Sequence, residues 1–334
     1  RDLHSFPTRR SSDLVVANLA YLSGKNIGII GYGNQGRAQA LNMRDSGVCS
    51  ITVGSVSDSS AEQALEDGFE VHSIADTAAG SDILFLLLPD EVLPDIYASD
   101  IAPNLKDGAV LNFSSGYNIT YKHVIPPANV DVILLGPRMI GRGVRDFYVN
   151  GKGFPAVLAI HQDYSGGAFE IALALAKAIG ATHSGVYRIT FDQETYVDLF
   201  SEQAVWPLIY HVIVEAFNCH LANGIPSELS LLELYVSREA AFMLEKASDV
   251  GLFGQMPYHS RTSRYGQMFN FNRIAPDMIR DYMAKVMAEI KDGTFDAQWQ
   301  KEQTIDTINF ATMQNKLLQE PLSVAERRLL RISN

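Results

Sequence analysis

The first part of the chain alternates short, continuously apolar runs with stretches of helical periodicity. The apolar runs are 26–30, 50–53, 70–71, 83–88, 109–113, 130–135 and 154–160. Short runs without polar alternation are typical of strands that helices cover on both faces. The helical stretches are 37–46, 61–67 and 167–179. This alternation predicts an α/β fold with a doubly wound, mostly parallel sheet.

The pattern changes near Thr190, and no further strand is predicted after it. The segments with helical periodicity are 195–217, 229–247, 276–292 and 296–318. We therefore expect two domains, 15–190 and 191–334, of which the second is all-helical. The first 14 residues are polar, carry three arginines and lack the apolar core of a secretory signal. We interpret residues 1–14 as an extraneous or disordered extension that takes no part in the fold.

Composition and charge narrow the class of protein. The 334 residues are 47% hydrophobic and 19% charged, with a formal net charge of −11. This negative charge argues against a protein that binds nucleic acid or anionic lipid over a broad surface. Only Cys49 and Cys219 are present, which favours a reducing, cytoplasmic setting. No apolar run approaches the ~18–20 residues that cross a bilayer, so we expect neither a nucleic-acid nor a membrane partner.

A glycine motif lies between the first predicted strand and the first predicted helix. It reads Gly31-Tyr-Gly-Asn-Gln-Gly36, and this context is the one that dinucleotide binding requires. Gly31 permits a tight turn, Gly33 lets the backbone approach a pyrophosphate, and Gly36 lets helix and strand pack closely. The helix N-terminus then offers free N–H groups to the phosphates. The alternative is a glycine-rich turn without a ligand.

The loop after the second strand bears on the choice of cofactor. Residues 54–60 contain no Arg or Lys, the side chains that usually contact the 2′-phosphate of NADP. Asp58 is suited to accept a hydrogen bond from a ribose 2′-hydroxyl and would repel a phosphate. The loop serines are suited to donate to a phosphate, and a solvated polar loop is the other interpretation. The sequence favours NAD over NADP.

Two carboxylates have the spacing of a metal-binding pair. Asp198 and Glu202 are four residues apart on a predicted helix, so they share one face about a turn apart. Their neighbours are apolar, and a divalent cation would offset the repulsion between two partly buried carboxylates. The alternative is that Asp198 caps the helix behind Thr195 while Glu202 is solvated.

Several motifs, in order along the chain, resemble one family. They are IIGYGNQGRAQALNMRDSGV, LLLPDEV, IAPNLKDGAVL, GYNI, TFDQETYVDLFSEQAV and IKDGTFDAQW. Over residues 19–332 the chain resembles ketol-acid reductoisomerase of the short class. The resemblance implies a Rossmann-like N-terminal domain and a knotted helical C-terminal domain that forms an intimate homodimer or a higher homo-oligomer. It also implies two Mg²⁺ ions, and alkyl migration in an acetohydroxy acid followed by nicotinamide-dependent reduction, in branched-chain amino-acid biosynthesis.

The resemblance assigns roles to individual residues of this chain. The cofactor-binding positions that it implies are Tyr32, Gly33, Asn34, Gln35, Ser59, Asp90, Glu91 and Gly141. Val56 stands where the family usually has a phosphate-binding Arg. The resemblance supports Asp198 and Glu202 as metal ligands and implies that Ser260 contacts the substrate.

The chain departs from the family at its second carboxylate pair. The family has two Glu four apart on a later helix, which complete the metal site from the partner subunit. Here Glu233 and Glu239 are six apart, so at least one ligand of that pair is displaced. Surface roles for both glutamates are the alternative.

The catalytic positions also differ. Ser115 stands at the position of the family's catalytic His, and the family's Lys-Gly-Pro-Gly-His stretch is Arg138-Met-Ile-Gly-Arg142 here. Ser115 and Arg138 are therefore the candidate catalytic residues. Arg is suited to hold a carboxylate but not to transfer a proton near neutral pH. We predict a ketol-acid reductoisomerase-like enzyme in which rearrangement is more affected than reduction. The alternatives are a relative that reduces another 2-keto acid or an imine, and a cofactor-binding pseudoenzyme.

Overall fold

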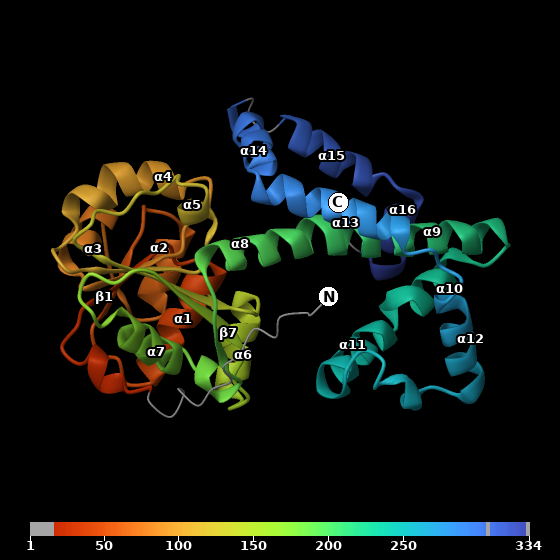
Figure 1. Cartoon of the computed structure of the whole chain (residues 1–334), viewed down its shortest axis with the longest axis horizontal. Helices are drawn as coiled ribbons and strands as arrows, with labels where there is room; N and C mark the ends of the chain where they lie inside the picture. The colour runs from red at the N-terminus through yellow and green to blue at the C-terminus, as the bar shows by residue number, and fades with distance from the viewer. Residues whose placement is uncertain (1–16, 305–307, 332–334) are drawn as a thin grey trace, which may run out of the picture. The chain divides into compact units, whose positions relative to one another are not determined.

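The computed structural model describes residues 17–304 and 308–331, which form two compact units (Figure 1). The chain divides into these units between Val197 and Asp198. The proposed extension, residues 1–14, lies outside the described residues. We call the first unit the sheet unit and the second the helical unit.

The sheet unit is built on eight strands. They are β1 (Ile27–Ile30), β2 (Ile51–Gly54), β3 (Glu70–His72), β4 (Ile83–Leu86), β5 (Val110–Phe113), β6 (Asp131–Pro137), β7 (Ala156–Gln162) and β8 (Val186–Arg188). Their order is β3-β2-β1-β4-β5-β6-β7-β8. Neighbouring strands pair in parallel except β6 and β7, which are antiparallel. The predicted mostly parallel sheet is therefore confirmed, and β8 is a strand that the apolar pattern did not predict.

Helices cover both faces of the sheet. They are α1 (Asn34–Asp45), α2 (Ser59–Glu66), α3 (Ile74–Gly80), α4 (Leu93–Ile96), α5 (Tyr117–Thr120), α6 (Gly141–Val149) and α7 (Ala168–Ala178). Strands β1, β4, β5 and β6 are buried along their whole length. One core packs the sheet against α1 and α7, and a second packs the other face against α3 and α4 (Figure 1). Burial on both faces explains why these strands lack polar alternation.

Short single-turn elements complete the sheet unit. They are η2 (Leu19–Leu22), η3 (Tyr97–Ile101), η4 (Ala102–Asn104) and η5 (Ala181–His183). Helix α8 (Phe191–Phe200) begins in the sheet unit and runs across the division between the units. Because the strands are mostly parallel, their carboxyl ends share one edge, where ligands of such sheets bind.

The helical unit contains no strand among its described residues. Its elements are η6 (Ser201–Val205), α9 (Trp206–Ala222), α10 (Ser227–Leu231), η7 (Leu232–Val236), α11 (Glu239–Val250), η8 (Met256–Tyr258), α12 (Arg261–Phe271), α13 (Asp277–Lys291), α14 (Thr294–Thr304), α15 (Ile308–Leu318) and α16 (Pro321–Leu330). The prediction of an all-helical C-terminal region is confirmed. Among the described residues of the whole chain, no helix is both long and apolar enough to cross a membrane.

Two predicted helices of this unit differ from the structure. The segment 229–247 is not one helix, because η7 is a π-helical turn and Arg238 takes a left-handed conformation with φ +67°. A non-glycine residue with positive φ ends the regular helix there, and α11 starts anew at Glu239. The segment 296–318 falls in α14 and α15, and residues 305–307 between them lie outside the described residues.

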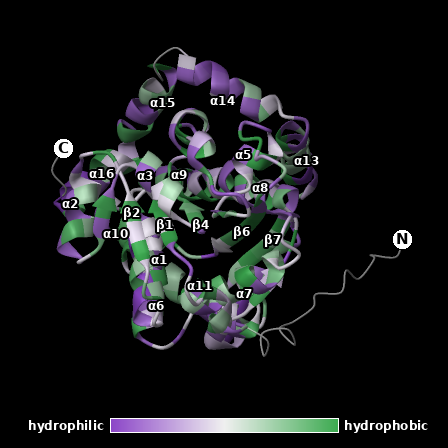
Figure 2. Cartoon of the chain, turned by 90° about the vertical axis from the view of Figure 1, so that its left-hand side faces the viewer, coloured by the Kyte–Doolittle hydropathy of each residue, from purple (hydrophilic) through white to green (hydrophobic). Residues whose placement is uncertain are grey.

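The helical unit buries few of its apolar side chains. A core cluster among its described residues consists of Phe217, Leu231 and Leu322 with partly buried neighbours. Many large apolar side chains of α9, of α11 to α13 and of α15 are exposed, among them Phe242, Phe269 and Met313. In Figure 2 the strands of the sheet are coloured mainly as hydrophobic, whereas the helices carry both colours.

Candidate cofactor and catalytic site

The glycine motif forms a tight turn between β1 and α1. Gly31 has φ +91°, and a Cβ there would lie 2.7 Å from the carbonyl oxygen of Leu87. A Cβ on Gly36 would lie 2.1 Å from the carbonyl oxygen of Gly31, whereas one on Gly33 would meet no atom within 4 Å. Helix α1 starts at Asn34 without a side-chain cap. Its first N–H groups thus border open space, which fits a pyrophosphate.

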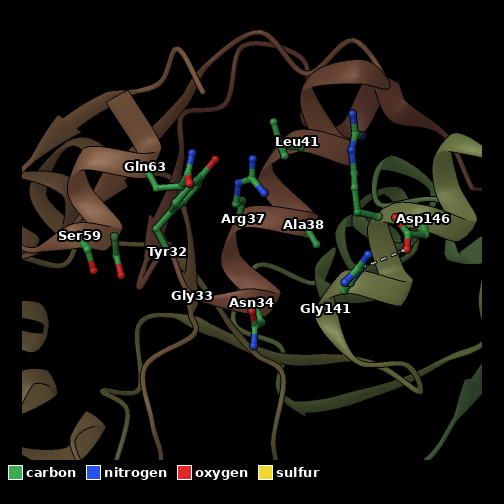
Figure 3. A pocket seen from close by; sticks show the side chains of 13 residues that line it. Tyr32, Gly33, Asn34, Arg37, Ala38, Leu41, Ser59, Gln63, Gly141 and Asp146 are labelled. Carbon is green, nitrogen blue, oxygen red and sulfur yellow. Dashed lines mark ion pairs between the residues drawn. The ribbon is translucent and has the colours of Figure 1, made fainter. Parts of the chain in front are cut away.

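A pocket of about 530 Å³ opens beside this turn (Figure 3). Its lining includes several residues that the resemblance assigned to the cofactor, namely Tyr32, Gly33, Asn34, Ser59 and Gly141. Figure 3 shows that these residues come from the turn and from α2 and α6, while Arg37 and Leu41 project from α1. Loops and helices that are far apart in sequence therefore converge on one pocket.

Asp67 binds two residues that line this pocket, Tyr32 and Arg37. Its Oδ2 accepts hydrogen bonds from the Tyr32 hydroxyl at 2.9 Å and from Arg37 Nε at 2.6 Å. Arg37 Nη2 also donates to Oδ1 at 3.0 Å. The hydrogen bond from Arg37 holds the pKa of Asp67 below its usual value, and burial together with Asp67 raises the pKa of Tyr32. The sequence analysis missed Asp67, because it is 30 residues from Arg37 and belongs to no motif.

Asp58 has a structural role that the sequence did not reveal. It is the N-cap of α2, where its Oδ1 accepts hydrogen bonds from the backbone N–H groups of Ser60 and Ala61, each at 3.0 Å. A carboxylate therefore occupies the helix end next to Ser59 and Ser60 of the pocket. Val56, in the same loop, has an exposed side chain at 59%. The pocket nevertheless has cationic residues on α1 and α6, namely Arg37, Arg142 and Arg145.

A second, smaller cavity of about 190 Å³ lies at the carboxyl ends of β4 and β5. Gln35, Asp90, Ser114 and Ser115 are among its lining residues. Gln35 Nε2 donates to the carbonyl oxygen of Met139 at 2.9 Å, and its Oε1 accepts from Gln39 Nε2 at 3.1 Å. Gln39 Nε2 also lies 3.5 Å from Ser114 Oγ, so the cofactor turn is linked to the loop after β6 directly and to the loop after β5 through Gln39. Glu91 follows Asp90 and is exposed outside both cavities.

Ser115, Asp90 and Asn118 form a chain of hydrogen bonds at this cavity. Ser115 Oγ lies 3.4 Å from Asp90 Oδ2 and accepts from the backbone N–H of Tyr117 at 3.3 Å. Asn118 Nδ2 donates to Asp90 Oδ1 at 3.2 Å and to its carbonyl oxygen at 3.1 Å. Asp90, assigned to the cofactor by resemblance, therefore contacts the candidate catalytic serine.

Arg138, the other candidate catalytic residue, is fixed by Glu194. Glu194 is 2% exposed; its Oε1 accepts from Arg138 Nη2 and its Oε2 from the backbone N–H of Gly116, both at 2.7 Å. These contacts link α8 to the loops after β5 and β6. The sequence analysis did not single out Glu194. The sequence does contain a pattern that points to Glu194, because residues 194, 198 and 202 are carboxylates at successive four-residue intervals.

The candidate metal ligands lie in the helical unit. Asp198 is half-buried near the end of α8, and the exposed Glu202 lies in the π-helical turn η6. They remain four residues apart, which fits two ligands of a divalent cation. Across residues 17–304 and 308–331, no group of three or more His, Cys, Asp or Glu gathers as a metal site. The pair in this chain therefore fits a partial ligand set.

The second carboxylate pair does not fit a shared site within the chain. Glu233 lies in η7 and Glu239 starts α11, on either side of the left-handed Arg238. Both side chains are exposed. Ser260, the candidate substrate residue, caps α12 by accepting from the backbone N–H of Ser263 at 3.2 Å.

Comparisons with known proteins cover most of both units. Residues 21–185 match the family described as acetohydroxy acid isomeroreductase, NADPH-binding domain, and residues 191–334 match the ketol-acid reductoisomerase C-terminal domain. The chain is 38% identical to the putative ketol-acid reductoisomerase 3 of Saccharolobus solfataricus, covering 95% of this chain and 96% of that one. It is 37% identical to the ketol-acid reductoisomerase (NADP(+)) of Pyrobaculum calidifontis, over 94% and 96%.

A solved structure is similar over nearly the same length. It is described as an NADH-preferring ketol-acid reductoisomerase from an uncultured archean. The TM-score is 0.88 at 32% identity, with 95% of this chain and 97% of that chain covered. The likeness therefore includes the fold of both units.

Proposed function

The chain belongs to the ketol-acid reductoisomerase family, and from this premise we propose that it rearranges and reduces an acetohydroxy acid. The proposal rests on one observation: Gln35 of the glycine motif lines the same cavity as Ser115, the candidate catalytic residue. When bound, the nicotinamide would supply a hydride and Mg²⁺ would polarise substrate oxygens. The chain's own residues would orient the substrate, with Arg138 suited to hold its carboxylate.

We propose that residues 15–190 bind the dinucleotide and that NADH is preferred. Two features of the α2 terminus support this preference. No cation stands between Gly54 and Ser60, and the Asp58 carboxylate already caps the helix end where a 2′-phosphate would approach. Ser59 and Ser60 line the same pocket and are suited to hydrogen-bond a ribose hydroxyl. The similar solved structure is described as NADH-preferring.

We propose that residues 191–334 bind Mg²⁺ and dimerise. Asp198 and Glu202 would hold the ion, with Glu233 or Glu239 contributed by the partner subunit. The support is the four-residue spacing of the first pair, which among the described residues belongs to no larger group of metal-ligating side chains. Oxygen ligands of this kind suit Mg²⁺.

A second copy of this chain would cover the exposed apolar side chains of the helical unit. An apolar groove of about 470 Å³ lies between Phe200 and α13, where Ile279, Met283 and Met287 line it. Contiguous exposed apolar surface of this kind marks interaction sites. A homodimer or higher homo-oligomer is therefore proposed, and the knot and the cytoplasmic setting remain predictions.

Product analysis tests the proposed function. The enzyme is incubated with acetolactate and NADH or NADPH, with and without Mg²⁺, beside a parallel incubation with a simple 2-keto acid. We expect a dihydroxy acid from acetolactate that requires Mg²⁺. Reduction of the 2-keto acid without any conversion of acetolactate would instead establish the alternative of a reductase without rearrangement.

A further inference from the structure

The small cavity at the ends of β4 and β5 contains a single ionisable side chain. Among the described residues that line it, Asp90 alone carries a carboxyl group, and the others are Gln35, two serines and apolar residues or proline. Asp90 lies next to the cofactor turn, since Gln35 lines the same cavity. A proton acceptor therefore faces the space where the turn meets Ser115.

Asn118 orients the Asp90 carboxylate. It donates to Oδ1 at 3.2 Å and to the Asp90 carbonyl oxygen at 3.1 Å, so two contacts hold the aspartate from one side. The other carboxylate oxygen, Oδ2, faces Ser115 Oγ at 3.4 Å. Catalytic hydrogen bonds are often this long without substrate and shorten when it binds.

The backbone orients the serine in turn. Tyr117 N–H donates to Ser115 Oγ at 3.3 Å, which occupies one lone pair of the hydroxyl oxygen. The serine proton is then suited to point at Asp90 Oδ2. A hydroxyl with an adjacent base that a third group orients is the arrangement that activates serine for proton transfer.

We propose that Ser115 and Asp90 form a proton relay for the rearrangement, with Asn118 as the positioning residue; the relay rests on the function proposed above. The substrate hydroxyl loses its proton to Ser115 Oγ, while the serine proton passes to Asp90 Oδ2. The alkyl group migrates with its bonding electrons to the adjacent carbonyl carbon. That carbonyl oxygen gains an electron pair and takes a proton from Ser115, which regains one from Asp90.

This sequence of transfers balances without a further reactant. One O–H bond of the substrate breaks and another forms, and the relay returns to its starting state. The relay also accounts for the absence of an imidazole at position 115. A serine hydroxyl is a weak base by itself, but an aspartate beside it is a proton acceptor near neutral pH.

Paired variants test the relay in the full-length enzyme. Ser115→Ala and Asp90→Asn should each lower kcat for acetolactate about a hundredfold or more, the usual worth of general acid–base help. The double variant should be no slower than the slower single variant, because one relay is broken only once. KM for acetolactate should change far less than kcat, and Ser115→Thr, which keeps the hydroxyl, should restore most of the rate.

Matched controls and a second substrate separate the possible outcomes. Asp95→Asn and Ser99→Ala change the same residue types in the exposed part of the following segment and should leave turnover unchanged. Direct reduction of the rearranged 2-keto acid should fall less than acetolactate turnover in both relay variants. Full acetolactate turnover in Asp90→Asn, or additive losses in the double variant, would overturn the relay alone. No acetolactate turnover by the unaltered enzyme would overturn the proposed function and the relay with it.

Discussion

The two units of this chain bury their apolar residues to very different extents. The strands β1, β4, β5 and β6 are buried from end to end. In the described part of the helical unit, six hydrophobic residues are buried: Ala204, Phe217, Leu231, Val286, Ile290 and Leu322. Most of the exposed large hydrophobic side chains among the described residues belong to this unit. The sheet unit therefore has a core of its own, whereas the helical unit leaves many apolar side chains exposed, as surfaces that bind partners do.

The candidate cofactor site and the candidate metal ligands also lie in different units. The glycine turn, both cavities and the relay residues lie within the sheet unit, where each is fixed by hydrogen bonds of the same unit. The candidate metal ligands lie in the helical unit, where Glu202, Glu233 and Glu239 are exposed. Cofactor binding should therefore survive changes that remove metal binding and assembly.

The largest expected effect comes from a charge in the apolar groove. Met283→Glu places a carboxylate in the surface that we assign to the second copy, and burying an unpaired charge is very costly. We expect dissociation of the oligomer and loss of acetolactate turnover, while NADH binding to the sheet unit persists. Light scattering after size-exclusion chromatography and NADH fluorescence titration measure both.

Ile125→Glu is the matched control, because Ile125 is an apolar residue of the sheet unit that is 77% exposed. It should leave the oligomer intact. An oligomer that also survives Met283→Glu would show that the groove lies outside the interface.

The next effect concerns the metal. Glu202→Gln should lower Mg²⁺-dependent turnover about a hundredfold or more and abolish Mg²⁺ binding in calorimetry, because Asp198 would be the only carboxylate of the first pair left to bind the ion. NADH binding should stay within error. Glu215→Gln, an exposed glutamate on the following helix α9, is the control. Undiminished Mg²⁺ binding in Glu202→Gln would remove Glu202 from the site.

A smaller effect is expected at the α2 terminus. Asp58→Arg should raise kcat/KM for NADPH relative to NADH by about ten- to a hundredfold, the usual worth of a hydrogen bond to a charged group. The variant also loses a helix cap, at a cost of about 1 kcal/mol. Asp58→Ser keeps a capping oxygen and removes only the charge, so it should show a smaller shift without loss of stability. A strong NADPH preference in the unaltered enzyme would contradict this account.

The smallest effect concerns the stability of the sheet unit. Because the pKa of Asp67 is lowered in the folded protein, its ion pair with Arg37 stabilises the fold above the unfolded pKa of about 3.9. That contribution is lost as the pH falls through the folded pKa. Asp67→Asn should therefore lower the free energy of unfolding by ~1 kcal/mol at neutral pH, given the exposed guanidinium.

Urea denaturation of the two proteins from neutral pH downward measures this difference. It should stay constant above about pH 5 and shrink below pH 4, where Asp67 in the unfolded chain is protonated. Glu62→Gln, an exposed acid on α2, should show no such trend. A difference that stays constant on acidification would mean that Asp67 acts by packing alone.

What the sequence predicted correctly depended on local patterns. The strands β1, β4, β5 and β6 are short apolar runs, and the glycine turn is defined by residues within six positions of one another. Edge strand β8 escaped prediction because two of its three residues are exposed. The Asp67 and Glu194 contacts join residues 30 to 78 positions apart, and such pairing depends on the tertiary fold.

The break at Arg238 escaped prediction for another reason. The residues around it, such as Leu232 and Glu239, are compatible with a helix, and no Gly or Pro marks the interruption. Residues other than glycine, Arg included, are uncommon in the left-handed region of φ and ψ. The single long helix predicted there was wrong because local propensity carried no sign of the π-helical turn.

The double use of Asp58 has a consequence for how such enzymes diversify. One side chain both caps α2 and places a negative charge beside the pocket, so a direct change to Arg alters coenzyme preference and helix stability together. Serine caps helices about as well as aspartate, which makes Asp58→Ser a neutral stepping stone. An enzyme that first acquires Asp58→Ser can later gain a cationic residue elsewhere in the loop, so that no intermediate on this route has a destabilised helix.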